Sequence, residues 1–268
     1  MPETRIVLTG LVALLVAGCA AVQSGPLPDE LQGLAPTGKL RVALLDANAV
    51  HVIRDPSGDM KGVSHDLGKA LAGRLGVAFQ PQIYPTIAGM LDAGRKGDWD
   101  VAFLGVSPER RAFLEFTANH LEVEYGYLVP AGSKIAEIGQ VDRAGVRVAV
   151  VDKGSPDAFL THALKSAKLV RTAAIPGALQ LLAAGKADTI AGLKPNMYAV
   201  SAKLSGSRVL EGRPGAEGAA LALPRDRHPA AFAYARQFIE DAKRSGLVQQ
   251  AIDRAGLRGA IVAPLTAH

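Results

Sequence analysis

Arg110, in the segment VSPERRAFLEFT at 106–117, is the strongest candidate for ligand chemistry in the sequence. Ser107 has the residue type of a helix N-cap, so Arg110 would fall in the first helical turn, where the positive end of the helix dipole disfavours a cation. A guanidinium beside free backbone amides can hold a carboxylate through two parallel hydrogen bonds. We therefore predict that Arg110 binds an anionic group; the alternative is a surface ion pair with Glu109 or Glu115.

Three further polar residues stand beside expected strand or helix ends. Ser155 is expected at a helix start, where it can cap the helix, contact a ligand, or do both. Asp46 follows an apolar strand and either binds a ligand or only ends that strand. Lys194 precedes a proline at another helix start and either faces a binding site or is solvated.

Motifs for metal, phosphate or nucleophilic chemistry do not occur in the sequence. The 6 histidines show no HxxxH or Cys–His spacing, and there is no GxSxG or phosphate-binding loop. The net charge is +5, but basic and acidic residues are interspersed, which does not indicate nucleic-acid binding. We expect neither a cofactor nor a metal. Asp46 and Asp157 are weak candidates for the carboxylic acid that an enzyme would need.

The candidate residues have to be positioned by alternating strands and helices. Apolar runs alternate with amphipathic segments along the chain, which predicts an α/β fold with mainly parallel sheets. Strands are expected at 41–45, 77–83, 100–104, 146–151, 169–173 and 189–193. Helices are expected at 64–76, 86–94, 155–164, 176–184, 229–244 and 247–254.

The strand and helix units occur in two similar sets. RVALLD at 41–46 matches RVAVVD at 147–152, and GDWDVAFLGVSP at 97–108 matches GKADTIAGLKP at 185–195. The separations differ between the two matches, so they predict two lobes of one design and not a solenoid. The alternative is chance agreement of common glycine and proline positions.

Two apolar strands, expected at 121–130 and 218–224, would connect the two sets. A chain that leaves the first lobe, builds the second and returns needs two crossing strands, and these would form a hinge. We therefore assign 38–128 plus 223–268 to lobe 1 and 129–222 to lobe 2.

The N-terminus has the pattern of an export signal. An apolar stretch at 6–17 follows Arg5 and is too short to span a bilayer. Cys19, the only cysteine, ends the run LVAGC, which resembles the bacterial lipobox, in which this cysteine becomes the first mature residue and carries the lipid. The alternative is a simple signal cut one or two residues later. We predict a signal peptide at 1–18, a lipid-anchored linker at 19–37 and a periplasmic location.

Five segments resemble a known family: GKLRVALLDA at 38–47, DPSGDMKGVSHDLGKALAGRLGV at 55–77, WDVAFLGVSPERRAFLEFT at 99–117, YGYLVPAGS at 125–133 and GKADTIAG at 185–192. The family is that of the family 3 extracellular solute-binding proteins of bacterial ABC importers. The resemblance implies a two-lobed type II periplasmic binding protein fold with two mainly parallel sheets joined by a two-strand hinge. It also implies that the lobes close over a small ligand, most often an amino acid, whose carboxylate Arg110 binds.

Two departures from the family pattern concern lobe 1. Asn48 stands where the family has an aromatic residue that stacks on the ligand. The segment before Arg110 is about two residues shorter than the family pattern, judged with the usual uncertainty of motif alignment. The contacts of the missing positions would then come from Leu104, Gly105 and Ser107.

A third departure concerns the charge of the ligand. Leu193, followed by Lys194, stands where the family has an acidic residue that meets an α-ammonium. A buried ammonium without a carboxylate partner loses the compensation for its desolvation. We therefore expect that an ordinary α-amino acid does not fit. If Lys194 faces the binding site and not the solvent, Lys194 and Arg110 would present one cation from each lobe to an acidic ligand.

These observations predict a lipid-anchored receptor that captures a small carboxylate-bearing solute, amino acid-like or an organic acid. The family resemblance implies that the receptor is a monomer and that it delivers the solute to ABC permease subunits. We expect no enzymatic activity. Two alternatives stay open: a periplasmic enzyme of the cyclohexadienyl dehydratase type on the same fold, and an orphan interaction or sensing lipoprotein.

Overall fold

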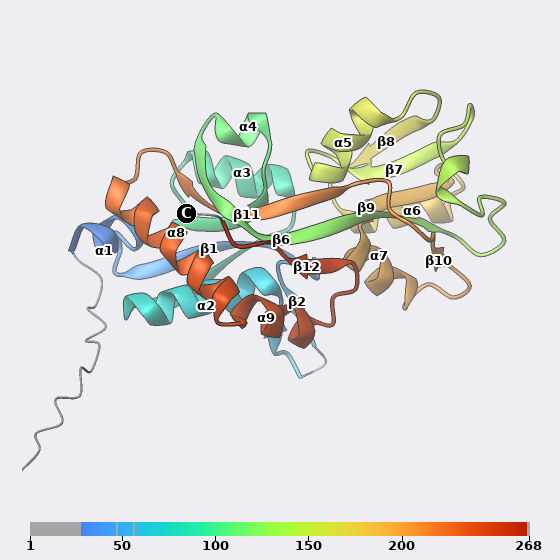
Figure 1. Cartoon of the computed structure of the whole chain (residues 1–268). Coiled ribbons are helices and arrows are strands. Elements are labelled where there is room, and N and C mark those ends of the chain that lie inside the picture. Colours follow the sequence, from blue (N-terminus) through green and yellow to red (C-terminus); the bar gives the residue numbers. More distant parts are fainter. Residues whose placement is uncertain (1–27, 47, 56, 267–268) are drawn as a thin grey trace, which may run out of the picture.

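The computed structural model describes residues 28–46, 48–55 and 57–266 (Figure 1). The predicted signal peptide, the lipidation of Cys19 and the linker as far as residue 27 lie outside the described residues. Within those residues, every helix is too short or too polar to pass through a bilayer.

The chain builds one half of the molecule, then the other, and then returns to the first. The first half consists of α1 (Pro28–Leu34), β1 (Lys39–Leu45), β2 (Ile53–Arg54), β3 (Met60–Lys61), α2 (Val63–Leu75), β4 (Ala78–Tyr84), α3 (Ile87–Arg95), β5 (Val101–Gly105) and α4 (Pro108–Arg111). The second half follows β6 (Leu114–Val129) and consists of the 3-10 helix η1 (Ile138–Gln140), β7 (Arg147–Val151), α5 (Ser155–Ala163), β8 (Lys168–Thr172), α6 (Ile175–Ala183), β9 (Thr189–Leu193), α7 (Lys194–Ser201) and β10 (Arg208–Val209). The return consists of β11 (Ala216–Pro224), α8 (Pro229–Arg244), α9 (Leu247–Ala255) and β12 (Ala260–Val262).

Two long strands, β6 and β11, connect the halves. The strand order is β4-β1-β5-β11-β6-β9-β7-β8. The strands β4, β1 and β5 are parallel in one lobe, as are β9, β7 and β8 in the other. Both β6 and β11 are antiparallel to their neighbours, and in Figure 1 they cross from one lobe to the other. The predicted two-lobed α/β fold with a two-strand connection is confirmed.

Helices cover the sheet of the first lobe on its two faces. The helices α2, α8 and α9 bury apolar side chains against one face, among them Leu67, Leu71, Phe238 and Ile239. On the other face, α3 packs with Trp99, whose Nε1 donates to Met90 O at 2.9 Å. Trp99 is fully buried, as the sequence predicts for a core residue.

The two lobes contain the same arginine–aspartate arrangement. Arg41 donates from N and Nε to Asp100 Oδ2 at 2.9 and 3.0 Å, and from Nη2 to Oδ1 at 2.7 Å. Arg147 donates to Asp188 in the same way, at 2.8, 3.0 and 2.8 Å. In the first lobe the arginine lies in β1, which pairs with β5, the strand that follows the aspartate. In the second lobe the arginine begins β7, which pairs with β9, the strand that follows the aspartate there. The repeated sequence segments therefore correspond to a repeated structural unit.

The end of the predicted linker belongs to the folded part of the chain. Residues Pro28–Leu34 form α1, which packs on α8. Leu34 is fully buried, and a Cβ on Gly33 would collide with Ala231 of α8. The linker prediction is wrong for these residues. A helix of 7 residues is too short for its apolar positions to show a clear helical period, and only the packing on α8 shows which of its positions are buried.

Candidate functional site

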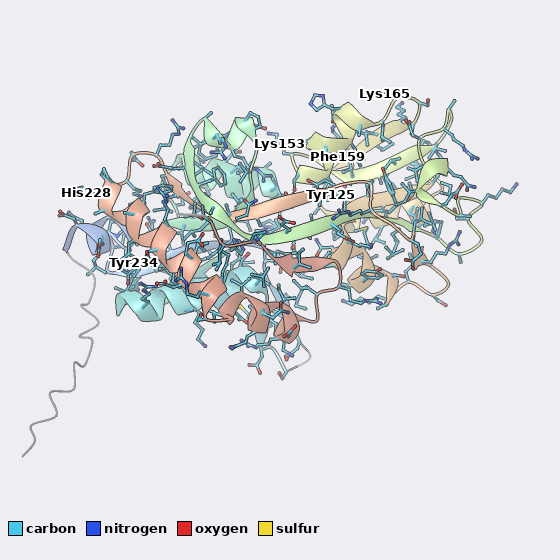
Figure 2. The ribbon with its side chains drawn as sticks, in the orientation of Figure 1. Tyr125, Lys153, Phe159, Lys165, His228 and Tyr234 are labelled. Carbon is cyan, nitrogen blue, oxygen red and sulfur yellow. The ribbon has the colours of Figure 1, made fainter. Side chains whose placement is uncertain are left out.

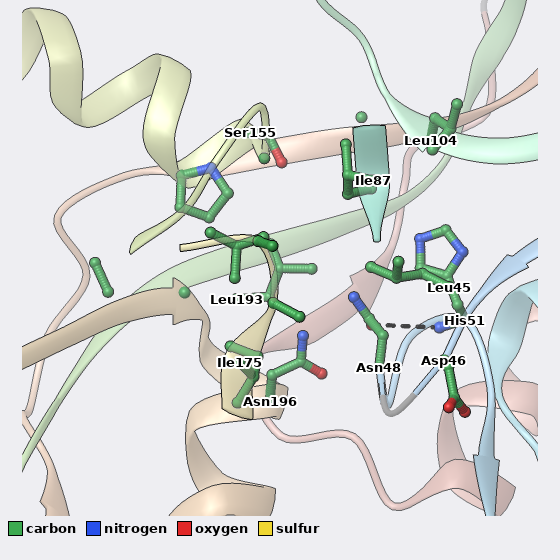
Figure 3. A pocket seen from close by; sticks show the side chains of 18 of the residues that line it. Leu45, Asp46, Asn48, His51, Ile87, Leu104, Ser155, Ile175, Leu193 and Asn196 are labelled. Atoms are coloured by element: carbon green, nitrogen blue, oxygen red, sulfur yellow. Dashed lines mark hydrogen bonds between the residues drawn. The ribbon is translucent and has the colours of Figure 1, made fainter. Parts of the chain in front are cut away.

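A cavity of about 260 Å³ lies between the two lobes, where β1 and β5 end on one side and where α5, α6 and α7 begin on the other. Figure 3 shows this arrangement, with Leu45, Ile87 and Leu104 facing Ile175 and Leu193 across it. Most of the lining is apolar. The carboxyl ends of parallel strands are the usual position of binding sites in α/β folds.

Arg110 lies inside this cavity with only 4% of its surface exposed. Its Nη1 donates to Gly105 O at 2.7 Å, and its Nη2 donates to Lys153 O of the second lobe at 2.9 Å. Burial lowers the pKa of Arg110, while the carboxylates of Glu217 and Glu109 oppose that change. The guanidinium stays charged and keeps N–H groups that these two carbonyls do not use.

The helix that carries Arg110 differs from the predicted one. The helix α4 is only 4 residues long, so its dipole is small. The prediction that the positive end of a helix dipole disfavours the Arg110 guanidinium is therefore wrong. The carbonyls of Gly105 and Lys153 stabilise the guanidinium instead. Ser107 caps α4 as predicted, since its Oγ accepts from Arg110 N at 3.3 Å, but it does not line the cavity.

Glu217 lines the cavity with a carboxyl group. This residue was not among the predicted ligand contacts. It belongs to β11, and its Oε2 is buried without a hydrogen-bond partner among the described residues. A Cβ on Gly105 would overlap with this oxygen, so Gly105 makes room for it. Burial raises the pKa of Glu217, and the Ser155 hydroxyl and Arg110 oppose the rise. The only signal in the sequence is an acidic residue just before an apolar strand.

Ser155 and Tyr125 lie next to this carboxylate. Ser155 is the first residue of α5 and lines the cavity, whereas the N-cap is Gly154 and not Ser155 as predicted. Burial and Glu217 raise the pKa of Tyr125, and hydrogen bonding to Ser155 lowers it. The Tyr125 ring packs on Phe159 at 5.3 Å between centroids, where the second lobe meets the connecting strands (Figure 2).

The structure brings together most of the other predicted ligand contacts. Asp46, Asn48, Leu104, Gly105, Arg110 and Ser155 all line the cavity. The Oδ1 of Asn48 accepts from Val50 N at 3.0 Å, so this oxygen holds its own loop, whereas Asp46 is exposed.

Lys194 does not line the cavity, although it is buried. Its Nζ donates to Glu124 Oε2 at 2.8 Å and to Gly212 O at 3.0 Å. Its neighbour Leu193 does line the cavity and adds to the apolar part. The pair of cations considered for Arg110 and Lys194 is therefore not formed, and the cavity contains the carboxyl group of Glu217 instead.

Two hydrogen bonds join the lobes across the cavity. The first is that of Arg110 to Lys153 O. The second is donated by Ala49 N to Asn196 Oδ1 at 2.8 Å. Lys153 has φ 58°, the one positive φ of a non-glycine residue in the described ranges, which turns its carbonyl towards Arg110. The lobes thus lie in a closed arrangement.

A buried histidine completes the polar lining. Burial, with a smaller contribution from Arg110, lowers the pKa of His51 to about 4. Its Nδ1 has no hydrogen-bond partner within the part of the chain that the structure describes. His51 is therefore neutral near pH 7. In the same part of the chain, no three histidine, cysteine or acidic residues are grouped as a metal site would require.

Two α/β lobes, a two-strand connection and a small cavity between them define a two-lobed binding protein of the type II periplasmic class. The family model described as bacterial extracellular solute-binding proteins, family 3, matches residues 40–255. The chain belongs to this family. A search of curated proteins finds no match.

Solved structures agree with this fold. An amino acid ABC transporter substrate-binding protein from Streptococcus pneumoniae bound to L-arginine is similar over 86% of this chain and 99% of that one, with 21% identity and a TM-score of 0.72. A solute receptor for L-cysteine of Neisseria gonorrhoeae is similar over 82% and 90%, with 21% identity and a TM-score of 0.71. An ancestral amino acid-binding protein, a precursor of cyclohexadienyl dehydratase, is similar over 84% and 98%, with 23% identity and a TM-score of 0.70. At these identities the likeness establishes the fold alone.

Proposed function

We propose that this protein is the receptor of an ABC importer and captures a small solute with a carboxylate in the cavity between its lobes. The observation that carries the proposal is the burial of Arg110 in that cavity, with N–H groups left for a ligand. A buried guanidinium is the protein group best suited to a carboxylate, because it donates two parallel hydrogen bonds.

The cavity also limits the size of the solute. A volume of about 260 Å³ is small for a ligand site, which favours a molecule the size of one amino acid over a peptide or an oligosaccharide. The known ligands of the similar structures, L-arginine and L-cysteine, are in this size class.

The mechanism is closure of the lobes on the solute. The lining comes from both lobes, so a bound solute stabilises the closed arrangement by contacts that the open one cannot make. The membrane partner would be the permease subunits, which receive the solute from the closed receptor. A monomer held in the periplasm by a lipid on Cys19 remains part of this proposal.

A thermal-shift screen tests the proposal. The panel contains amino acids, di- and tricarboxylates and aromatic acids. A ligand that binds should raise the melting temperature, because at about 100 times its dissociation constant it adds about 2.7 kcal/mol to the free energy of unfolding. We expect Arg110→Gln to weaken binding by about 100-fold or more, because it leaves a buried carboxylate without its cation. The exposed neighbour Arg111, varied as Arg111→Gln, is the matched control and should bind normally. A panel without any hit would refute the proposal.

An enzyme on the same scaffold is the second candidate, and Glu217 is the observation that favours it. Its carboxyl is a better general acid than the exposed Asp46 or than Asp157, which accepts hydrogen bonds from Arg171 Nε and Lys153 N. Product analysis separates the two functions, since a receptor returns its ligand unchanged and an enzyme converts it. Conversion of a hit, lost in Glu217→Gln, would decide for the enzyme.

A further inference from the structure

The guanidinium of Arg110 and the carboxyl group of Glu217 line the same cavity, and no ion pair between them is found among the described residues. Arg110 uses two of its N–H groups on carbonyl oxygens, and Glu217 leaves Oε2 unpartnered. Within the described residues, no hydrogen bond or ion pair joins the two side chains, although they are near enough to influence each other electrostatically. A ligand that fits between them can therefore meet both.

The unpartnered oxygen indicates what the second ligand group is. A buried carboxylate oxygen without a donor is unfavourable, and the described part of the protein offers none to Glu217 Oε2. A ligand that carries only a carboxylate would add a second negative group beside Glu217. A ligand ammonium supplies N–H donors and a compensating positive charge, which is the combination that this site lacks.

The remaining lining indicates the rest of the ligand. Leu45, Ile87 and Leu104 of one lobe and Ile175 and Leu193 of the other surround the cavity (Figure 3). A third charge would lose its hydration here without gaining a partner. The apolar lining therefore suits a compact apolar side chain.

We propose that Glu217 of the connecting strand β11 is the acceptor of a ligand ammonium, and that the ligand is a small zwitterion with an apolar side chain, its carboxylate on Arg110. This inference rests on the proposed function. The acidic group comes from a strand that belongs to both lobes and not from the end of β9, where Leu193 stands. The ligand then contacts the connecting strand itself, in addition to the two lobes.

The test compares ligands that differ by one charged group. Dissociation constants are measured by titration calorimetry for L-alanine, L-valine, L-leucine, L-isoleucine, L-methionine and L-phenylalanine. Each is paired with the carboxylic acid that lacks its amino group, as 4-methylpentanoate pairs with L-leucine. We expect the best amino acid to bind the wild-type chain about 100-fold more tightly than its deaminated partner. In Glu217→Gln this ratio should fall below about tenfold.

Control variants separate the role of Glu217 from general damage. Glu115→Gln changes an exposed carboxylate on the adjacent strand β6 and should leave the ratio unchanged. Glu217→Asp keeps the charge but withdraws it by one methylene, so it should bind between wild type and Glu217→Gln. Circular dichroism and the melting temperature of each variant report whether it folds.

Two results would overturn the inference. If amino acids and deaminated acids bind equally in wild type and in Glu217→Gln, while Arg110→Gln still abolishes binding, then the receptor function holds and the role of Glu217 is wrong. If no amino acid or carboxylic acid of the screen binds at all, the proposed function fails and this inference fails with it.

Discussion

At the scale of single residues, the charge inside the cavity depends on whether the carboxyl group of Glu217 is protonated. Burial raises the pKa of Glu217 above its ordinary value of 4.5, against the effects of Ser155 and Arg110. Arg110 comes from α4, Ser155 from α5 and Tyr125 from β6, and the neutral His51 lines the same cavity. Among these groups, Glu217 is the carboxyl group, and its raised pKa means that it loses its proton at a higher pH than an exposed glutamate does.

This proton leads to a prediction about pH. Only the ionised form of Glu217 pairs with an ammonium, so binding of a zwitterion lowers the pKa of Glu217 and releases a proton. Affinity for the amino acid should therefore rise with pH, by up to about tenfold per unit, and become constant above the pKa of the free protein. Calorimetry between about pH 5 and 8 measures this, with Glu217→Gln as the control that should show no such rise. An affinity that falls with pH in the wild type would contradict the assignment.

The sequence predicts one side of the site better than the other. Arg110 is recognisable because Ser107 and the residues after it place it within a few positions of a strand end. Lys194 also stands at a strand end, but the direction of its side chain depends on Glu124 and on Gly212 O, which only the folded chain brings near. Glu217 is far away in sequence, and the pairing of β11 with β5 brings it to Gly105.

At the scale of secondary structure, elements with strong periodicity and clear ends are predicted best. The helix α2 ends before Gly76, which is left-handed with φ 70°, and Thr86 caps α3 as expected, with Oγ1 accepting from Gly89 N at 3.1 Å. The strand β6 begins at Leu114, earlier than predicted, because register shifts against β11 interrupt the regular alternation. Alternation is readable only where pairing is regular.

The repeated arginine–aspartate pairs offer a test of what burial contributes to an ion pair. Asp100 is fully buried and binds both Arg41 and Arg227, whereas the side chain of Asp188 is 34% exposed and pairs with Arg147. We expect Asp100→Asn to lower the free energy of unfolding by about 3–5 kcal/mol, because it leaves two arginines without their carboxylate. Asp188→Asn should lower it by about 1 kcal/mol or less.

Urea denaturation followed by circular dichroism measures both variants under one set of conditions. The geometry of the two pairs is nearly the same, so each variant serves as the control for the other. Equal losses of stability would show that burial and the second arginine do not matter at this position.

At the scale of the whole molecule, the strands β6 and β11 belong to both lobes and the cavity lies beside them. Each lobe forms most of its own core, although Leu193 and Phe159 of the second lobe also pack with the core of the first. Around the cavity the lobes meet through hydrogen bonds such as that from Ala49 N to Asn196 Oδ1, and elsewhere Arg258 lies 3.7 Å from the centre of the Tyr198 ring. Rotation about two strands leaves both cores intact, because it changes few backbone dihedrals. The position of the lobes is therefore sensitive to a small number of contacts across the cavity.

Asn196 provides the test of this sensitivity. Its Oδ1 is the acceptor for Ala49 N of the other lobe, so Asn196→Ala removes one hydrogen bond that exists only in the closed arrangement. The loss of one such bond weakens ligand binding by about two- to tenfold, because the ligand then has to supply that part of the closing free energy. Calorimetry gives the dissociation constant, and small-angle scattering gives the radius of gyration of the free protein, which should increase in the variant. Ser201→Ala, at the end of the same helix α7 and outside the cavity, is the control, and its affinity should match the wild type. If Asn196→Ala binds as tightly as wild type and has the same radius of gyration, closure does not depend on this contact. The hydrogen bond from Arg110 to Lys153 O would then be the contact that stabilises the closed arrangement.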